Sequence, residues 1–106
     1  MARRIIMRPE VPDDLTVIVD YFDLHSEGAG DRFLQSVFRT FDELAEMPGK
    51  GSLKRFRRPR LEGMRSWWVP GFRKYLIYYQ FTDQALTIFA VLHGARKVRE
   101  ILRKRV

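Results

Sequence analysis

The sequence contains no cysteine and only two histidines, His25 and His93. Without cysteine the chain cannot form disulfides, cysteine-based zinc sites or thiol nucleophiles. The two histidines lack the spacing of metal ligands, and no glycine-rich phosphate-binding loop occurs. We therefore expect the protein to work without a metal and without another cofactor.

Long apolar runs are also missing. The apolar stretch within residues 1–8 is too short for a secretion signal. No run approaches the roughly 18 apolar residues that a membrane-spanning helix needs. At 106 residues and 45% hydrophobic content, the chain has the material for one folded domain, residues 1–106. We expect a cytoplasmic protein that does not contact a membrane, and the lack of cysteine suits that reducing compartment.

Negative charge is scarce in the second half of the chain. Residues 1–62 contain 11 basic and 11 acidic residues, whereas residues 63–106 contain nine basic residues against Asp83 and Glu100, so the net charge of +7 arises there. Residues 49–60 also contain six basic residues and no acidic one. Such a field attracts a polyanion or an acidic protein, or serves solubility, and charge alone does not decide between them.

The first half predicts a strand followed by two helices. Residues 3–8 are β-prone, and Pro9 ends the segment because proline has no ladder donor. Asp13 and Asp14 favour a helix N-terminus, where carboxylates suit the helix dipole. Apolar residues at i, i+3, i+4 and i+7 extend this helix to residues 25–28.

A second helix is predicted over residues 30–47, because a wider apolar stripe recurs there with helical spacing. Pro48 and Gly49 end it. Two amphipathic helices with a short break between them indicate an antiparallel helical hairpin. The basic stretch 49–60 is predicted to be a loop.

The second half predicts three antiparallel strands over residues 64–69, 73–81 and 85–93, separated by turn residues. Side chains of a strand alternate between the two faces of its sheet. For the last strand this alternation predicts two sets: Leu86, Ile88, Ala90 and Leu92 on one face, and Thr87, Phe89, Val91 and His93 on the other.

Both faces of these strands are largely apolar, so both need cover. One face can pack on the helical hairpin. The other can be covered in part by a short basic helix around residues 98–102 and in part by a partner, because an exposed apolar face indicates a binding site. The predicted fold class is α+β, with the order β-α-α-β-β-β, an antiparallel-rich sheet on a helical hairpin, and a short basic C-terminal helix.

Several short motifs also occur in a particular order along nearly the whole chain. They are Asp14-Leu15, Tyr21-Phe22, Ala29, Arg32-Phe33, Leu44, Met47-Pro48-Gly49, Pro59, Leu61-Glu62-Gly63-Met64-Arg65, Val69-Pro70-Gly71-Phe72-Arg73-Lys74-Tyr75-Leu76-Ile77-Tyr78-Tyr79 and Val91-Leu92-His93-Gly94-Ala95-Arg96. With the element order above, this set resembles the RelE/ParE superfamily of bacterial type II toxin–antitoxin toxins. Within that superfamily it is most similar to the ParE-like, plasmid-stabilisation group.

The resemblance implies a toxin that inhibits growth and is neutralised by a cognate antitoxin, which is acidic and partly disordered until it binds. ParE-type toxins poison DNA gyrase, whereas RelE-type toxins cleave messenger RNA on the ribosome, and the shared fold does not choose between them. We favour the gyrase-directed activity. The alternatives are a ribosome-dependent mRNA endonuclease and a non-toxic module that binds the antitoxin.

If the chain is RelE-like, the resemblance implies the catalytic residues Arg65, Arg73, His93 and Arg96. Arginines would stabilise the charge that develops on the phosphate, and His93 could act as acid or base. Alternatively, His93 fixes the end of its strand through hydrogen bonds, and Arg65 and Arg73 pair with Glu62 or Asp83. The sequence therefore leaves enzymatic activity open.

Two departures from the RelE pattern favour the ParE-like assignment. Trp67 stands where RelE has a second basic residue on that strand, and no tyrosine follows Arg96. The gyrase-directed hypothesis gives a target-binding surface of Arg96, Lys97, Arg99, Arg103, Lys104 and Arg105. The antitoxin is expected to contact the aromatic residues Trp67, Trp68, Tyr78 and Phe89.

Overall fold

The computed structural model describes residues 2–106, and its elements follow the predicted order with small additions. Two 3-10 turns and a two-residue strand lie within or beside the stretch predicted to be a loop. The elements are β1 (Arg4–Met7), α1 (Val11–His25), α2 (Ala29–Glu46), η1 (Pro48–Lys50), β2 (Ser52–Leu53), η2 (Pro59–Leu61), β3 (Arg65–Val69), β4 (Phe72–Phe81), β5 (Ala85–His93) and α3 (Val98–Lys104).

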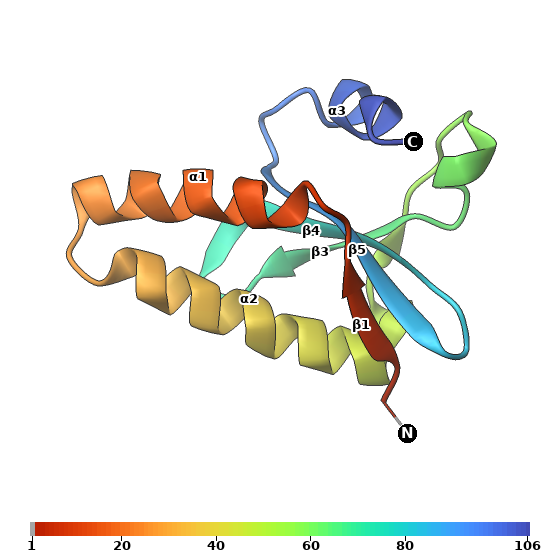
Figure 1. The fold of residues 1–106 in the computed structure, drawn as a ribbon, viewed down its shortest axis with the longest axis horizontal. Coiled ribbons are helices and arrows are strands. Elements are labelled where there is room, and N and C mark those ends of the chain that lie inside the picture. Colours follow the sequence, from red (N-terminus) through yellow and green to blue (C-terminus); the bar gives the residue numbers. More distant parts are fainter. Residues whose placement is uncertain (1) are drawn as a thin grey trace.

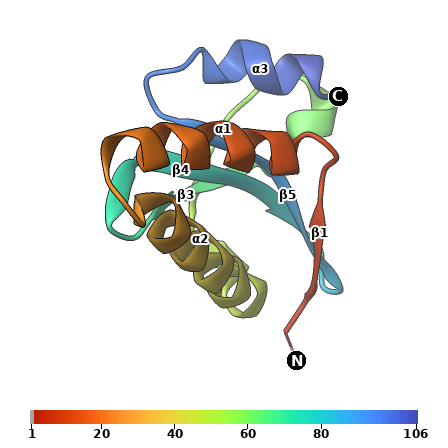
Figure 2. The same ribbon diagram turned by 60° about the vertical axis from the view of Figure 1, so that its left-hand side comes forward.

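The five strands form one sheet in the order β1-β5-β4-β3-β2. β1 lies parallel to β5 at one edge, and the other three strand pairs are antiparallel. The hairpin of α1 and α2 covers one face, and α3 lies on the other side of the sheet (Figures 1 and 2). The predicted fold class is confirmed. β2 escaped prediction because two exposed residues are too few to show alternation.

The main core lies between the sheet and the helical hairpin. Its largest contribution comes from α2, whose Phe33, Val37, Phe41 and Leu44 are at most 2% exposed. Each such side chain stabilises the fold by about 1.5–3 kcal/mol relative to an exposed position. The helical spacing of these residues therefore fixes how α2 lies on the sheet. No helix within residues 2–106 is both long and apolar enough to cross a membrane.

A second core lies on the opposite face of the sheet, under α3. Leu102 of α3 is fully buried there against side chains of both β4 and β5. The buried members of this cluster are Leu61, Met64, Tyr78, Phe89, Ala90, Leu92 and Leu102. The prediction that residues 98–102 cover part of this face is confirmed.

A β-bulge at Phe89 interrupts the alternation of β5. Tyr78 pairs with Ala90 while Tyr79 pairs with Ile88, so Phe89 is the extra residue. The extra residue reverses the facing of every position after it. Ala90 and Leu92 consequently join the cluster under α3, whereas Val91 joins the main core. The prediction that Ala90 and Leu92 share a face with Leu86 and Ile88 was therefore wrong.

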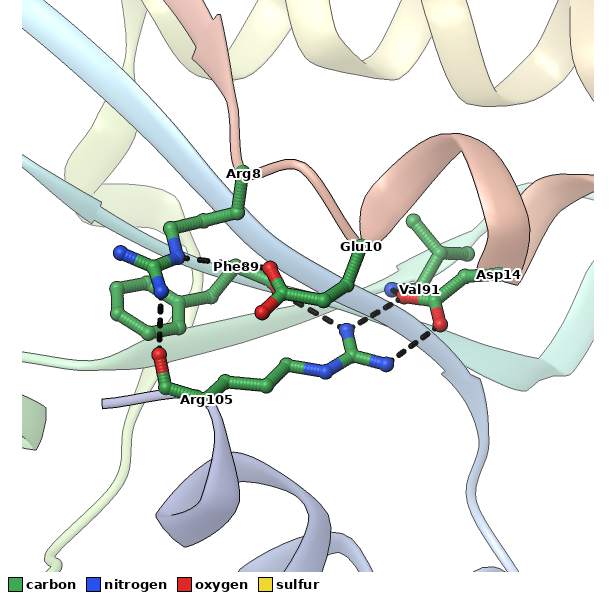
Figure 3. Close-up of polar contacts among 6 residues, drawn as sticks. All are labelled: Arg8, Glu10, Asp14, Phe89, Val91 and Arg105. Atoms are coloured by element: carbon green, nitrogen blue, oxygen red, sulfur yellow. Dashed lines mark hydrogen bonds and ion pairs between the residues drawn. The ribbon is translucent and has the colours of Figure 1, made fainter.

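A buried ion pair occupies this bulge (Figure 3). The Arg105 guanidinium donates two hydrogen bonds of 2.7 Å to the Asp14 carboxylate, whose side chain is 6% exposed. The same two residues satisfy the bulge, because Val91 N–H donates to Asp14 (3.1 Å) and Arg105 donates to the Phe89 carbonyl (3.1 Å). Arg8 in turn donates to the Arg105 carbonyl. These contacts join the start of α1, the centre of β5 and the end of the chain.

Three tyrosines of β4 should make the stability of the folded protein depend on pH in the alkaline range. Burial is the largest cause that raises the pKa of Tyr75, Tyr78 and Tyr79 above the usual value. The folded state then holds these protons more tightly than the unfolded state, so the stabilisation is complete below the unfolded pKa of about 10 and is lost as the pH rises above it. We expect the free energy of unfolding to fall by up to about 1.4 kcal/mol per pH unit for each tyrosine.

Urea unfolding between about pH 8 and pH 11, followed together with tyrosinate absorbance, checks this expectation. The variant Tyr78→Phe removes one titrating group, and its stability should decline less steeply. If the free energy of unfolding of Tyr78→Phe fell with pH as steeply as that of the unmodified protein, the raised pKa of Tyr78 would be contradicted.

Candidate functional site

The four residues predicted to be catalytic do not meet at one place. Arg65 lies opposite Tyr79 in the β3–β4 ladder, six residues along β4 from Arg73. Six residues of strand span roughly 20 Å. His93 lies near the Arg73 end, because it pairs with Tyr75. The sheet therefore separates Arg65 from the other three residues.

Arg65 and Arg73 also have separate local contacts. Arg65 donates to the Gly51 carbonyl at 2.7 Å and to the Gly49 carbonyl at 3.3 Å, which ties β3 to the turn after α2. The Arg73 guanidinium lies 5.4 Å from the ring centre of Trp68, a cation–π contact. Within residues 2–106, neither arginine forms an ion pair with Glu62 or Asp83.

His93 holds the turn that follows β5. Its Nδ1 atom accepts a hydrogen bond of 2.9 Å from the Ala95 N–H. An acceptor nitrogen carries no proton, so this hydrogen bond corresponds to the tautomer with its proton on Nε2. Its ring also meets Tyr75 edge-on at 5.0 Å between centroids. These contacts give His93 a structural part to play, and its proposed catalytic role stays a prediction.

His93 and Arg96 do share a small hollow of about 180 Å³ between α1 and the end of β5. Its wall on the helix side includes Val17 and Tyr21. These two residues continue with Leu24 as a stripe on the outer side of α1, with exposed fractions of 64%, 52% and 83%. We call Val17, Tyr21 and Leu24 the α1 stripe.

Sequence reasoning missed the α1 stripe. The signal was present, since 17, 21 and 24 recur at i, i+4 and i+7, as the core-facing residues do. A helix with two apolar rows can bury only one of them against its own sheet. The second row is therefore evidence for a contact surface.

The residues predicted to bind the target have different exposures. Arg96, Lys97, Arg99, Arg103 and Lys104 are all exposed. Lys104 lies 3.9 Å from Glu100, one turn earlier on α3. Arg105 differs from these five, because its side chain is only 13% exposed and is bonded to Asp14. Those hydrogen bonds are the main cause that raises the pKa of Arg105, so it stays charged.

The four aromatic residues predicted to bind an antitoxin also divide. Tyr78 and Phe89 are each only 5% exposed and lie in the core under α3. Trp67 packs against the main core and stacks on Trp68 at 4.0 Å between ring centroids. Trp68 is 36% exposed, and its ring also contacts the Arg73 guanidinium. Within residues 2–106 no group of three or more aspartates, glutamates or histidines is placed to hold a metal ion.

The strand order, the helical hairpin on one face and the basic helix on the other define a RelE/ParE-type toxin fold. Within that class the chain belongs to the ParE toxin family, because the family model described as "ParE toxin of type II toxin-antitoxin system, parDE" matches residues 5–98. This confirms the resemblance drawn from the sequence motifs.

A solved structure gives an independent comparison of the fold. The structure titled "Chromosomal ParDE TA system from P. aeruginosa" superposes with a TM-score of 0.63. The alignment covers 87% of this chain and 96% of the other, at 13% sequence identity, so it establishes likeness of fold alone. No curated protein matched the sequence.

Proposed function

We propose that this chain is a toxin that inhibits growth by poisoning DNA gyrase through protein–protein contact, and that a cognate antitoxin neutralises it. Membership of the ParE toxin family supports the toxin assignment. We favour gyrase over RNA cleavage because Arg65 lies far from Arg73, His93 and Arg96. Cleavage of RNA would need these charged groups gathered around one reacting phosphate. Gyrase implies a cytoplasmic site of action.

The target-binding surface in this proposal consists of Arg96, Lys97, Arg99, Arg103 and Lys104. All five are exposed and lie on α3 or on the turn before it. Arg105 is left out, because its guanidinium is already committed to Asp14. A surface of one charge sign favours an acidic patch on the partner and speeds association.

The antitoxin-binding surface in this proposal combines the α1 stripe with Arg96 and the exposed Trp68. An acidic segment that folds on binding would place apolar side chains on the stripe and carboxylates near Arg96. Tyr78 and Phe89 could take part only if α3 moved away from the sheet, because both are buried beneath it.

A gyrase supercoiling assay with the purified full chain tests the proposal. We expect inhibition that the protein encoded beside the toxin gene reverses. A triple charge reversal, Arg96→Glu with Lys97→Glu and Lys104→Glu, should weaken inhibition by about tenfold or more, because close charge pairs across an interface are lost.

The matched control reverses three arginines that are exposed on β1 and α2, with the substitutions Arg4→Glu, Arg32→Glu and Arg39→Glu. Its total charge change is the same, and its inhibition should stay within about threefold of the unmodified protein. If both triple variants weakened inhibition equally, the proposed target-binding surface would be refuted. No inhibition by folded protein would refute gyrase as the target, and ribosome-dependent RNA cleavage would then be the next assay.

A further inference from the structure

A groove with four arginines runs between α3 and the loop that connects β2 to η2. Arg99 and Arg103 project from α3, and Arg57 and Arg58 come from the loop; all four are exposed. The hollow between them measures about 510 Å³, and Phe56 and Leu61 also line it. We call it the basic groove. The loop and α3 lie beside each other in both views of the ribbon (Figures 1 and 2).

Two contacts hold the walls of the basic groove together. Arg99 donates a hydrogen bond of 3.2 Å to the Arg55 carbonyl. Its guanidinium also lies 5.1 Å from the ring centre of Phe56. The loop is therefore attached to α3, and residues more than 40 positions apart in the sequence are held on one surface.

The positive charge of the basic groove is not neutralised internally. Among residues 2–106, none of its four arginines forms an ion pair. No acidic residue in the described part of the chain lines the basic groove itself. Glu62 borders one adjoining hollow, and Glu100 borders another and is paired with Lys104. Guanidinium groups gathered without counter-charges repel one another, and a bound polyanion would relieve that repulsion.

The form of the surface favours a nucleic-acid duplex over an acidic peptide or a single strand. Of the two apolar side chains that line the basic groove, Leu61 is only 1% exposed, and the Phe56 ring already lies against the Arg99 guanidinium. A peptide would therefore have to displace Arg99 to place an apolar anchor there. Single strands need aromatic faces for base stacking, and Arg99 already lies over the Phe56 ring. Guanidinium forks match phosphate oxygens, and a duplex backbone presents these at regular intervals.

We propose that the basic groove binds the phosphate backbone of duplex DNA. Arg57, Arg58, Arg99 and Arg103 each contact a phosphate, and no base is read. The groove itself indicates a duplex, whereas the choice of DNA over RNA rests on the proposed function, because gyrase holds duplex DNA. Within the target-binding surface, Arg99 and Arg103 would then contact the DNA that gyrase holds, while Arg96, Lys97 and Lys104 contact the protein.

Fluorescence anisotropy with the full chain and a labelled 20-base-pair DNA duplex, without gyrase, tests this proposal. Four phosphate contacts give a slope of about −4 for the logarithm of the binding constant against the logarithm of salt concentration. The variant Arg57→Ala with Arg58→Ala should bind about tenfold more weakly or worse, with a slope near −2. Arg103→Ala alone should reduce the slope by about 1 and provides a variant outside the loop.

The matched control is Arg4→Ala with Arg39→Ala, which removes the same charge from exposed positions outside the groove. It should change the affinity less than about threefold. Equal weakening in both double variants would show attraction by net charge alone and overturn the proposal. Tighter groove-dependent binding of an RNA duplex would overturn the choice of DNA, and groove-dependent binding of polyglutamate without DNA binding would indicate an acidic protein instead.

This test and the gyrase assay fail independently. The gyrase assay changes Arg96, Lys97 and Lys104, which do not line the basic groove. If the chain bound no DNA, the proposed contact with gyrase would be unaffected. DNA binding without gyrase inhibition would leave the basic groove standing.

Discussion

Replacing Asp14 by alanine is expected to lower the free energy of unfolding by about 3–5 kcal/mol. The substitution leaves the Arg105 guanidinium, 13% exposed, without its carboxylate. It also removes the acceptor of the buried Val91 N–H at the β5 bulge. An unpaired charge and an unpaired amide are both costly in a site that water scarcely reaches.

The neighbouring residue provides a matched control. Asp13 occupies the same first turn of α1 but is exposed. Asp13→Ala should cost at most about 1 kcal/mol, the size of a carboxylate interaction with the helix dipole. Urea unfolding of the two variants compares them directly, and similar losses would contradict the importance of the buried pair.

A double-mutant cycle measures the coupling within that pair. Arg105→Met removes the other charge and leaves the Phe89 carbonyl without its donor. If the ion pair dominates, the double variant Asp14→Ala with Arg105→Met should lose less stability than the two single variants added together, by about 1–3 kcal/mol. Strict additivity would mean that each residue acts through other contacts.

Gly51→Ala is expected to lower the free energy of unfolding by about 3 kcal/mol. The backbone is not the reason, because residue 51 has an extended conformation that any residue adopts. The Gly51 N–H donates to the Tyr79 hydroxyl at 3.0 Å, and that hydroxyl donates to the Pro48 carbonyl. A Cβ atom at residue 51 would overlap the hydroxyl and lie 2.9 Å from the Ser66 carbonyl oxygen. Tyr79 is fully buried and cannot move aside without disturbing the core.

Two further variants separate the causes of this loss. Tyr79→Phe keeps the ring and removes only the hydroxyl, so it should cost about 1–3 kcal/mol for the unpaired groups of Gly51 and Pro48. Gly49→Ala serves as the control, because a Cβ atom there meets nothing within 4 Å. It should change the stability by less than about 0.5 kcal/mol. Thermal or urea unfolding measures these changes. If Gly49→Ala lost as much stability as Gly51→Ala, the steric explanation would be refuted.

The two sites show why local patterns of sequence predict elements better than contacts. In the sequence, Asp14 is an acidic residue in the first turn of a predicted helix. The favourable interaction of a carboxylate with the helix dipole already explained such a residue there. Its partner Arg105 lies 91 residues away, in a basic tail that was predicted to be a target-binding surface. No periodicity connects positions so far apart, so the ion pair could not be predicted.

The β5 bulge illustrates the same limit within one strand. Alternation correctly placed Leu86 and Ile88 on the same face, and the structure packs that face on the helical hairpin. It failed from Ala90 onward, because the extra residue Phe89 reverses all later positions and leaves no trace in a pattern that is apolar on both faces. The burial of Tyr78 and Phe89 under α3 also depends on how well that helix covers the sheet.

By itself, the sequence determined the element order, the helical hairpin, the three main strands, the helix over the second face and the membership of the ParE toxin family. These follow from hydrophobic periods of 2 and 3.6, from turn residues and from ordered motifs, all of which are local. Tertiary structure alone decided that Arg105 is buried rather than free, that Arg65 lies far from Arg73, and that Arg57 and Arg58 share a groove with Arg99 and Arg103. Those outcomes depend on strand register, on one bulge and on a loop attached to a distant helix, which only the folded chain brings together.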